Sequence, residues 1–169
     1  RVLIPAFKKS SAQLHTIVSE SGVNGTIHGT RAGFANASSD ISTMLNENMI
    51  NTVVIATQHN SHAELVTQAL AAGKNVWVEK PLAINFKEID LIESTFRTAH
   101  DTCKVSGKGP QLMVGFNRRF APHIKKMCSL LSTVKAPKTV IITVNAGFVP
   151  EHHWTQDTFV GGGRIIGEC

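Results

Sequence analysis

The sequence predicts an α/β protein built on a doubly wound parallel sheet, followed by the start of an α+β region. Two observations carry this prediction. Short apolar runs alternate with longer segments whose apolar residues recur at helical spacing, which is typical of parallel β–α–β units with helices on both faces of a sheet. The clearest run, residues 52–57, is almost continuously apolar, as a strand covered on both faces should be.

The individual elements follow from the same periodicities, taken in chain order. Apolar residues at helical spacing predict helices, and runs or alternations of β-branched residues predict strands. The predicted helices span residues 1–9, 29–37, 41–48, 61–72, 85–99 and 120–133. The predicted strands span residues 13–18, 38–40, 52–57, 75–78, 112–117 and 138–145.

Helix boundaries are marked by residues that cap helix ends. Asp40 precedes the helix at 41–48 and is a suitable N-cap. Ser61 precedes the next helix, and Glu64 follows it at the spacing of a capping box. Gly73 is expected to close that helix, because glycine readily adopts the left-handed conformation found after helix ends.

The pattern changes after Arg119, and we place a domain boundary there. Residues 1–119 form the parallel α/β domain, and residues 120–169 begin a second domain of α+β type. The chain begins within a helical pattern, with neither an N-cap nor a strand before it, and stops within an apolar pattern. We therefore expect the sequence to be a piece of a longer protein, cut at both ends.

Composition narrows the class of protein. Hydrophobic residues make up 42% of the chain and charged residues 17%, which predicts a packed globular body. The net charge is +5, but lysine and arginine are scattered, so an anionic small molecule explains the charge as well as nucleic acid does. The three cysteines are far apart, which argues against a zinc cluster or a disulfide framework and favours the cytoplasm. No signal peptide or membrane span is apparent.

Polar and charged residues directly follow three of the predicted strands. They are residues 57–62, the run Glu79-Lys80-Pro81, and residues 117–119. The carboxyl ends of parallel strands meet at one edge of the sheet, which is where open α/β sheets bind ligands. Pro81 disfavours a helical conformation at Lys80 and so keeps this turn extended. Each group alone is explained equally well as a solvated surface charge, but their convergence predicts a binding site.

Three motifs in this order carry a resemblance to a known family. They are Val54-Ile55-Ala56-Thr57 with His62, then Ala72-Gly73-Lys74 with Val78-Glu79-Lys80-Pro81-Leu82, and finally Val114-Gly115-Phe116-Asn117-Arg118-Arg119-Phe120 with Pro122. Together they resemble the glucose-fructose oxidoreductase / inositol 2-dehydrogenase family, and residues 161–169 resemble the start of its active-site helix. The resemblance implies an N-terminal Rossmann domain, a C-terminal domain on an open antiparallel sheet, and NAD(P)-dependent chemistry on sugars or cyclitols.

The resemblance also implies roles for matching residues. Lys80 would be the catalytic residue beside the nicotinamide and the substrate carbinol, where an ammonium group can polarise a carbonyl or assist proton transfer. Glu79 would orient Lys80 and line the nicotinamide pocket. The cofactor-binding set comprises Ser19, Thr57, Gln58, His59, His62, Glu79, Lys80 and Arg118. The substrate-binding set comprises Arg119, Trp154, Arg164 and Glu168.

Several details stay open. The run His152-His153-Trp154 fits a rigid loop anchor as well as a substrate contact. A metal site is not expected, because two adjacent histidines cannot easily point at one ion. Ser19 leaves room for the 2′-phosphate of NADP, but the acidic Glu20 is adjacent, so both NAD and NADP are compatible with this position.

Two family features are expected outside these residues. The glycine-rich turn that binds the pyrophosphate should precede Arg1, together with one central strand, and the catalytic histidine should follow Cys169. The piece by itself is therefore expected to be inactive. The stretch 145–154 and the triple glycine at 161–163 also resemble a subset that is fused behind a zinc-type alcohol dehydrogenase-like domain.

The sequence thus predicts hydride transfer between a nicotinamide cofactor and a carbinol or keto carbon of a sugar, a cyclitol or a nucleotide sugar, the last in surface-polysaccharide synthesis. One alternative is a non-catalytic Rossmann-like module that binds a dinucleotide or a protein partner. Another is a structural interaction domain that dimerises through its open sheet. We expect a homo-oligomer formed through the C-terminal sheet, and neither a nucleic-acid nor a membrane partner.

Overall fold

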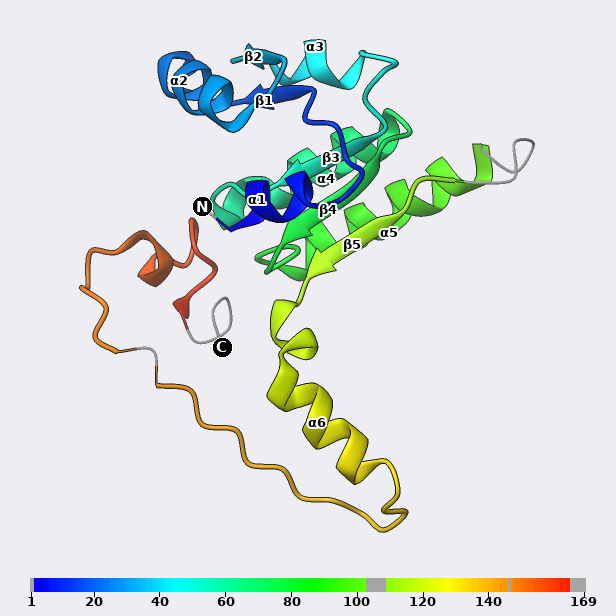
Figure 1. Cartoon of the computed structure of the whole chain (residues 1–169), viewed down its shortest axis with the longest axis vertical. Helices are drawn as coiled ribbons and strands as arrows, with labels where there is room; N and C mark the ends of the chain where they lie inside the picture. Colours follow the sequence, from blue (N-terminus) through cyan, green and yellow to red (C-terminus); the bar gives the residue numbers. More distant parts are fainter. Residues whose placement is uncertain (1, 103–108, 146, 165–169) are drawn as a thin grey trace.

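The computed structural model describes residues 2–102, 109–145 and 147–164, in which helices and strands alternate along the chain (Figure 1). The helices are α1 Leu3–Lys8, α2 Gly22–Ala32, α3 Ile41–Leu45, α4 His62–Ala71, α5 Phe86–Thr102 and α6 Pro122–Leu131. The strands are β1 Thr16–Val18, β2 Asn36–Ser38, β3 Thr52–Ile55, β4 Asn75–Glu79 and β5 Leu112–Gly115. Short 3-10 turns occur at η1 His59–Ser61, η3 Asn117–Phe120 and η4 Trp154–Gln156.

The described strands are all paired in parallel, which confirms the predicted α/β class. They form two sheets: β1 pairs with β2, and β4 lies between β3 and β5. No ladder joins the two sheets among the described strands. The register aligns Ile55 with Val78 and Glu79 with Gly115. The strands β3, β4 and β5 therefore end at one common edge.

The hydrophobic core lies between the three-stranded sheet and helices α4 and α5. Val66 and Leu70 of α4 and Val78 of β4 are completely buried, and Ile92 of α5 belongs to the same cluster. Burying one such side chain contributes about 1.5–3 kcal/mol. The expectation that both faces of β3 are covered is wrong, because Val54 points away from the core and is 41% exposed.

The other face of the sheet is covered in part by α1. The ring of Phe7 contacts Trp77 of β4 edge-on, with the ring centroids 6.1 Å apart. Gly115 of β5 leaves room for the indole, because a Cβ at this position would lie 3.0 Å from Trp77. This contact places α1 over the middle strand.

Helix α2 begins earlier than predicted. The sequence predicts a helix at 29–37, but α2 begins at Gly22 and is followed by Gly33, whose φ of 84° is left-handed. The glycines within the segment are typical of turns, which explains the error. One of them, Gly29, instead allows the helix to approach β1, since a Cβ there would lie 2.5 Å from Cγ2 of Ile17.

We expect Gly29→Ala to lower the free energy of unfolding by about 1–3 kcal/mol, the usual cost of an added methyl group in a packed contact. Gly22→Ala is the control in the same helix, because a Cβ there meets nothing within 4 Å. It should stabilise the fold by less than about 1 kcal/mol. Urea denaturation measures both, and equal midpoints would contradict the close contact between α2 and β1.

Asp40 caps α3, as predicted. Its carboxylate accepts hydrogen bonds from the Ser42 N–H at 2.9 Å and from the hydroxyls of Ser42 and Thr43 at 2.5 and 2.7 Å. These bonds, above all the one from the Ser42 hydroxyl, lower the pKa of Asp40 from 3.8 to about 2. The ionised form is the one that is bonded, so the cap stabilises the fold above the ordinary pKa. This contribution is lost as the pH falls through the lowered pKa.

We therefore expect Asp40→Ala to be less stable than the unmodified protein at neutral pH, with a difference that shrinks as the pH falls from about 4 to about 2. Thermal unfolding at stepped pH values measures this difference. Asp90→Ala, which removes an exposed carboxylate from α5, is the matched control. A difference for Asp40→Ala that stays constant over this range would contradict the proposed cap.

The predicted capping box before α4 is wrong. The Ser61 hydroxyl donates to the Gln58 carbonyl at 2.8 Å, because the 3-10 turn η1 leads directly into the helix and brings this carbonyl within reach. Glu64 does not turn back to Ser61 and instead accepts from the Gln68 amide at 3.0 Å. At the other end, Gly73 closes the helix as predicted, with a φ of 71°.

Residues 121–145 project away from this body (Figure 1). Helix α6 buries none of its side chains, and the chain then runs extended. For the single chain the predicted strand at 138–145 is wrong: these residues form no strand in it, and Ile141 and Ile142 are 88% and 72% exposed. A strand requires a backbone partner, and no described segment pairs with this one. The predicted antiparallel sheet therefore has no strand in the described ranges.

Candidate active site

The predicted site residues that follow β3 and β4 lie at one edge of the three-stranded sheet. Since Ile55 pairs with Val78, the turns after the two strands begin at neighbouring positions. Thr57 and Gln58 in the first turn are exposed, and Lys80 in the second is half-buried. This edge therefore presents two exposed polar side chains beside a turn that carries the half-buried residue Lys80.

The turn after β4 is fixed by Glu79. The Lys80 N–H donates to Glu79 Oε2 at 3.3 Å, and the peptide bond from Lys80 to Pro81 is cis. Gly115 lies opposite Glu79 and leaves space for the carboxylate, because a Cβ there would lie 3.2 Å from Oε2. Glu79 thus lies against the end of β5 and next to Lys80, while its part in orienting the Lys80 side chain stays a prediction.

The turn after β3 is held by hydroxyl groups. Thr57 Oγ1 and Ser61 Oγ are 2.6 Å apart, and the Ser61 hydroxyl donates to the Gln58 carbonyl. Because the Ser61 hydrogen is used there, Thr57 donates the bond between the two hydroxyls. The chain thus bends into η1 with a defined geometry, and the Gln58 side chain lies exposed next to it.

His62 has a different setting from the cofactor contact that the sequence predicts. It is completely buried, and both ring nitrogens face backbone carbonyls. Nδ1 is 2.7 Å from the Pro81 oxygen, and Nε2 is 3.2 Å from the Thr57 oxygen. His62 therefore connects the turn after β3 to the turn that contains Lys80. It contacts the backbone carbonyls of these two turns, so it bears on their relative position and not directly on a ligand.

His59 and Trp154 are brought together from distant parts of the chain. Their rings meet edge-on, with the centroids 4.7 Å apart, and His59 is only 5% exposed. Trp154 begins a stretch that comes back to the body of the protein, residues 154–163, which we call the return segment. This places a predicted substrate residue directly against a predicted cofactor residue.

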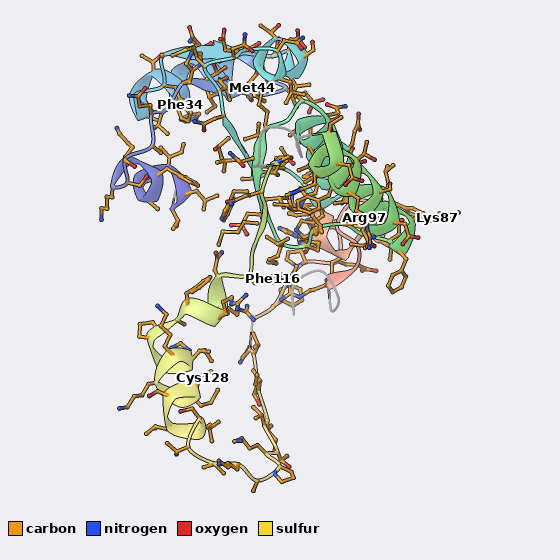
Figure 2. All side chains as sticks on the ribbon, turned by 90° about the vertical axis from the view of Figure 1, so that its right-hand side faces the viewer. Phe34, Met44, Lys87, Arg97, Phe116 and Cys128 are labelled. Atoms are coloured by element: carbon orange, nitrogen blue, oxygen red, sulfur yellow. The ribbon has the colours of Figure 1, made fainter. Side chains whose placement is uncertain are left out.

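Arg118 and Arg119 follow β5 in the turn η3, and both are exposed. Arg119 lies over the ring of Phe120, with the guanidinium carbon 5.4 Å from the ring centroid. Figure 2 shows Phe116 where the chain leaves the sheet toward α6. The two arginines are thus at the expected strand end, next to the junction with the projecting part.

Three predicted residues are placed apart from this group or outside the description. Ser19 lies at the end of β1, in the other sheet, where its hydroxyl donates to the Ser21 carbonyl at 3.2 Å. Arg164 is half-buried directly after the return segment. Glu168 lies outside the described residues.

Two hollows of the surface are described by the residues that line them. One, of about 460 Å³, lies between α3 and α4; the other, of about 730 Å³, is lined by residues from 148 to 160, including Trp154. Within the described residues, no three histidine, cysteine or acidic side chains are grouped to bind a metal ion. None of the described helices is both long and apolar enough to cross a membrane.

Sequence reasoning missed the partners of the return segment. Val160 and Gly161 contact η1 through their carbonyls, and Gly162 approaches Ile84. The triple glycine at 161–163 was the available indication, since glycine allows close backbone approach. Ile84 carries no such indication, because an apolar residue in a loop has no distinctive pattern.

Residues 3–106 match the oxidoreductase family with an NAD-binding Rossmann fold. Myo-inositol 2-dehydrogenase of Thermotoga maritima is 30% identical over 116 residues, which cover 67% of this chain and 32% of the relative. Inositol 2-dehydrogenase of Rhizobium meliloti is 29% identical over 97 residues, covering 57% of this chain and 27% of the relative. The matches thus span less than half the length of these relatives.

A solved structure agrees with the fold. Levoglucosan dehydrogenase in complex with NADH and levoglucosan superimposes with a TM-score of 0.69 at 22% identity, over 92% of this chain and 41% of that chain. At this identity the likeness concerns the fold alone. It extends beyond residue 106 and includes most of the projecting and returning parts.

Proposed function

This chain belongs to the oxidoreductase family with the NAD-binding Rossmann fold, and on that premise we propose that its complete gene product is a dehydrogenase or reductase of sugars or cyclitols. The reaction would move a hydride between the nicotinamide and a carbinol or keto carbon of the substrate. Relatives named inositol 2-dehydrogenase support this substrate class. Within this substrate class, a nucleotide sugar is the more specific substrate that we propose.

One observation carries the proposal: Lys80 stands at the carboxyl end of β4, the middle strand of the three-stranded sheet. Open α/β sheets bind their ligands at this edge. The exposed Thr57 and Gln58 follow the neighbouring strand, and Arg118 follows the strand on the other side. Hydroxyl, amide and guanidinium donors around one ammonium group fit a ligand with ribose hydroxyls and phosphates.

The chemistry divides between cofactor and protein. A bound nicotinamide supplies the hydride donor or acceptor. The Lys80 ammonium would donate a hydrogen bond to the reacting oxygen of the substrate and help a proton move there. Glu79 would keep the Lys80 turn in place through its bond to the Lys80 N–H. Thr57 and Gln58 would donate to the cofactor from the turn after β3.

The remaining assignments are proposals that follow from position. Arg118 would bind the cofactor, and Arg119 the substrate, since guanidinium groups suit hydroxyl, carboxylate or phosphate oxygens. Trp154 would contact the substrate from the hollow that it lines. Arg164 and Glu168 would lie on the substrate side. Ser19, at the end of β1, would face the ribose that distinguishes NAD from NADP.

The proposal is tested by titrating NADH and NADPH into the complete gene product and following nucleotide fluorescence. Turnover is then assayed with inositols, free sugars and nucleotide sugars. Binding of one nucleotide with turnover of at least one panel member is the expected result. Binding without turnover of any panel member would favour the alternative of a non-catalytic dinucleotide-binding module, and absence of binding would overturn both.

Self-association is proposed with the same function. The exposed Ile141 and Ile142 support a sheet formed by residues 138–145 in a homo-oligomer, because exposed β-branched residues in an extended segment favour strand pairing. Sedimentation of the complete gene product measures its oligomeric state. The cytoplasmic location stays a prediction from the cysteine spacing.

A further inference from the structure

The return segment is attached to the turn after β3 by three contacts. The Asn60 N–H donates to the Val160 carbonyl at 3.0 Å. His59 Nδ1 lies 2.7 Å from the Gly161 oxygen, so the ring donates to this carbonyl through the tautomer that carries hydrogen on Nδ1. The His59 ring also meets the Trp154 indole edge-on. All three contacts join residues about a hundred positions apart, so they define tertiary structure.

The conformation of the return segment is tightly specified. A Cβ at Gly161 would lie 2.6 Å from the Thr155 Cα, so only glycine fits there. Gly162 has a φ of 77°, and a Cβ on it would lie 3.0 Å from Cγ2 of Ile84. Thr155 itself is only 6% exposed. The segment is therefore a packed element with its own internal contacts.

These contacts place the return segment against two strand ends at once. His59 belongs to the turn after β3, and Ile84 belongs to the loop that follows Lys80 and Pro81. One element thus touches both loops from which the candidate active site is built. An element attached to both loops limits how far the two loops can separate.

We propose that the return segment is the outer wall of the active site and that His59 is the residue that positions it. The expected effect on turnover rests on the proposed function. The attachment of the return segment by His59 does not depend on that function. His59 acts through Gly161 and Trp154, so it is a positioning residue. A neutral hydrogen bond of this kind changes the equilibrium between attached and detached segment by about 2- to 10-fold.

Two substitutions separate the two contacts that His59 makes with the return segment, which are the bond to Gly161 and the ring contact with Trp154. His59→Phe keeps a ring against Trp154 but cannot donate to Gly161. His59→Asn places an amide N–H near the position of Nδ1 and keeps the donor, but it lacks the ring. Gly161→Ala disturbs the return segment from its own side without changing η1, and His123→Phe, on the exposed face of α6, is the control.

The attachment is measured by fluorine NMR of the complete gene product labelled with fluorotryptophan. The Trp154 line is assigned by its absence in Trp154→Phe, and a soluble gadolinium chelate broadens lines of exposed residues. In His59→Phe and Gly161→Ala we expect this broadening to increase by about 2- to 10-fold, in proportion to the detached population. In His59→Asn it should return toward the unmodified value, and His123→Phe should not change it.

Nucleotide affinity and turnover are measured on the same variants. We expect His59→Phe to lower kcat more than it raises the KM for the sugar, and His59→Asn to restore most of the loss. Unchanged broadening in His59→Phe would overturn the positioning role. Increased broadening with unchanged kcat would contradict the proposal that the return segment is the outer wall of the active site. Failure of the unmodified protein to bind any nucleotide would overturn the proposed function, while the Trp154 line still decides the attachment.

Discussion

Replacing Lys80 with methionine is expected to lower kcat by about 10²- to 10⁴-fold, the range typical of a lost general acid or base. Methionine has a similar length and no ammonium group, so the change removes the charge and the proton with little loss of volume. Nucleotide affinity should change by less than about tenfold, because the proposed cofactor donors Thr57 and Gln58 stay in place. Steady-state kinetics on the turned-over substrate and a fluorescence titration measure the two effects.

Two further variants show how Lys80 acts. Lys87→Met removes an exposed ammonium group from the start of α5 and should leave kcat within about twofold. Lys80→Arg keeps the positive charge but holds its proton firmly. Substantial activity in Lys80→Arg would assign an electrostatic role, and inactivity would assign proton transfer. Full activity of Lys80→Met would contradict the proposed role of this residue altogether.

Replacing His62 with phenylalanine is expected to lower the free energy of unfolding by about 1–3 kcal/mol, because it removes the imidazole N–H that faces the Pro81 and Thr57 carbonyls in a partly buried position. Phenylalanine nearly fills the volume of the ring, so lost packing contributes little. Chemical denaturation measures the change. The variant should also impair turnover, because Pro81 is covalently joined to Lys80.

The control for His62 is His28→Phe on the exposed face of α2. An exposed substitution of this kind should stay within about 0.5 kcal/mol of the unmodified protein. If His62→Phe were as stable as this control, the two carbonyls would have to find other partners. In that case His62 would not connect the two turns.

The parts of the fold that sequence reasoning predicted are those that local patterns determine. The core strands β3, β4 and β5 are short apolar runs, and α4 and α5 have clear helical spacing. These elements, and the common sheet edge at which the three strands end, can therefore be predicted from the sequence. Lys80 was identified because Pro81 and the preceding strand define its position. The resemblance in three short motifs then supplied its role.

The errors have physical causes that no local pattern reveals. The glycines of α2 serve close packing on Ile17 rather than a turn, and only the neighbouring strand shows this. Residues 138–145 have strand-like side chains but no backbone partner in the described ranges. His62 is polar, and its complete burial depends on carbonyls of two separate turns. The contact of His59 with Gly161 joins distant positions and has no periodicity at all.

The projecting part of the chain leaves the body at the end of β5 and rejoins it at His59, so both of its anchors lie at the edge that contains Lys80. Closing a flexible connection costs only about 0.6 kcal/mol more for each doubling of its length. Insertions and deletions between α6 and Trp154 therefore leave both anchors where they are. Chains of this kind can change the length of the outlying part while the groups around Lys80 keep their spacing.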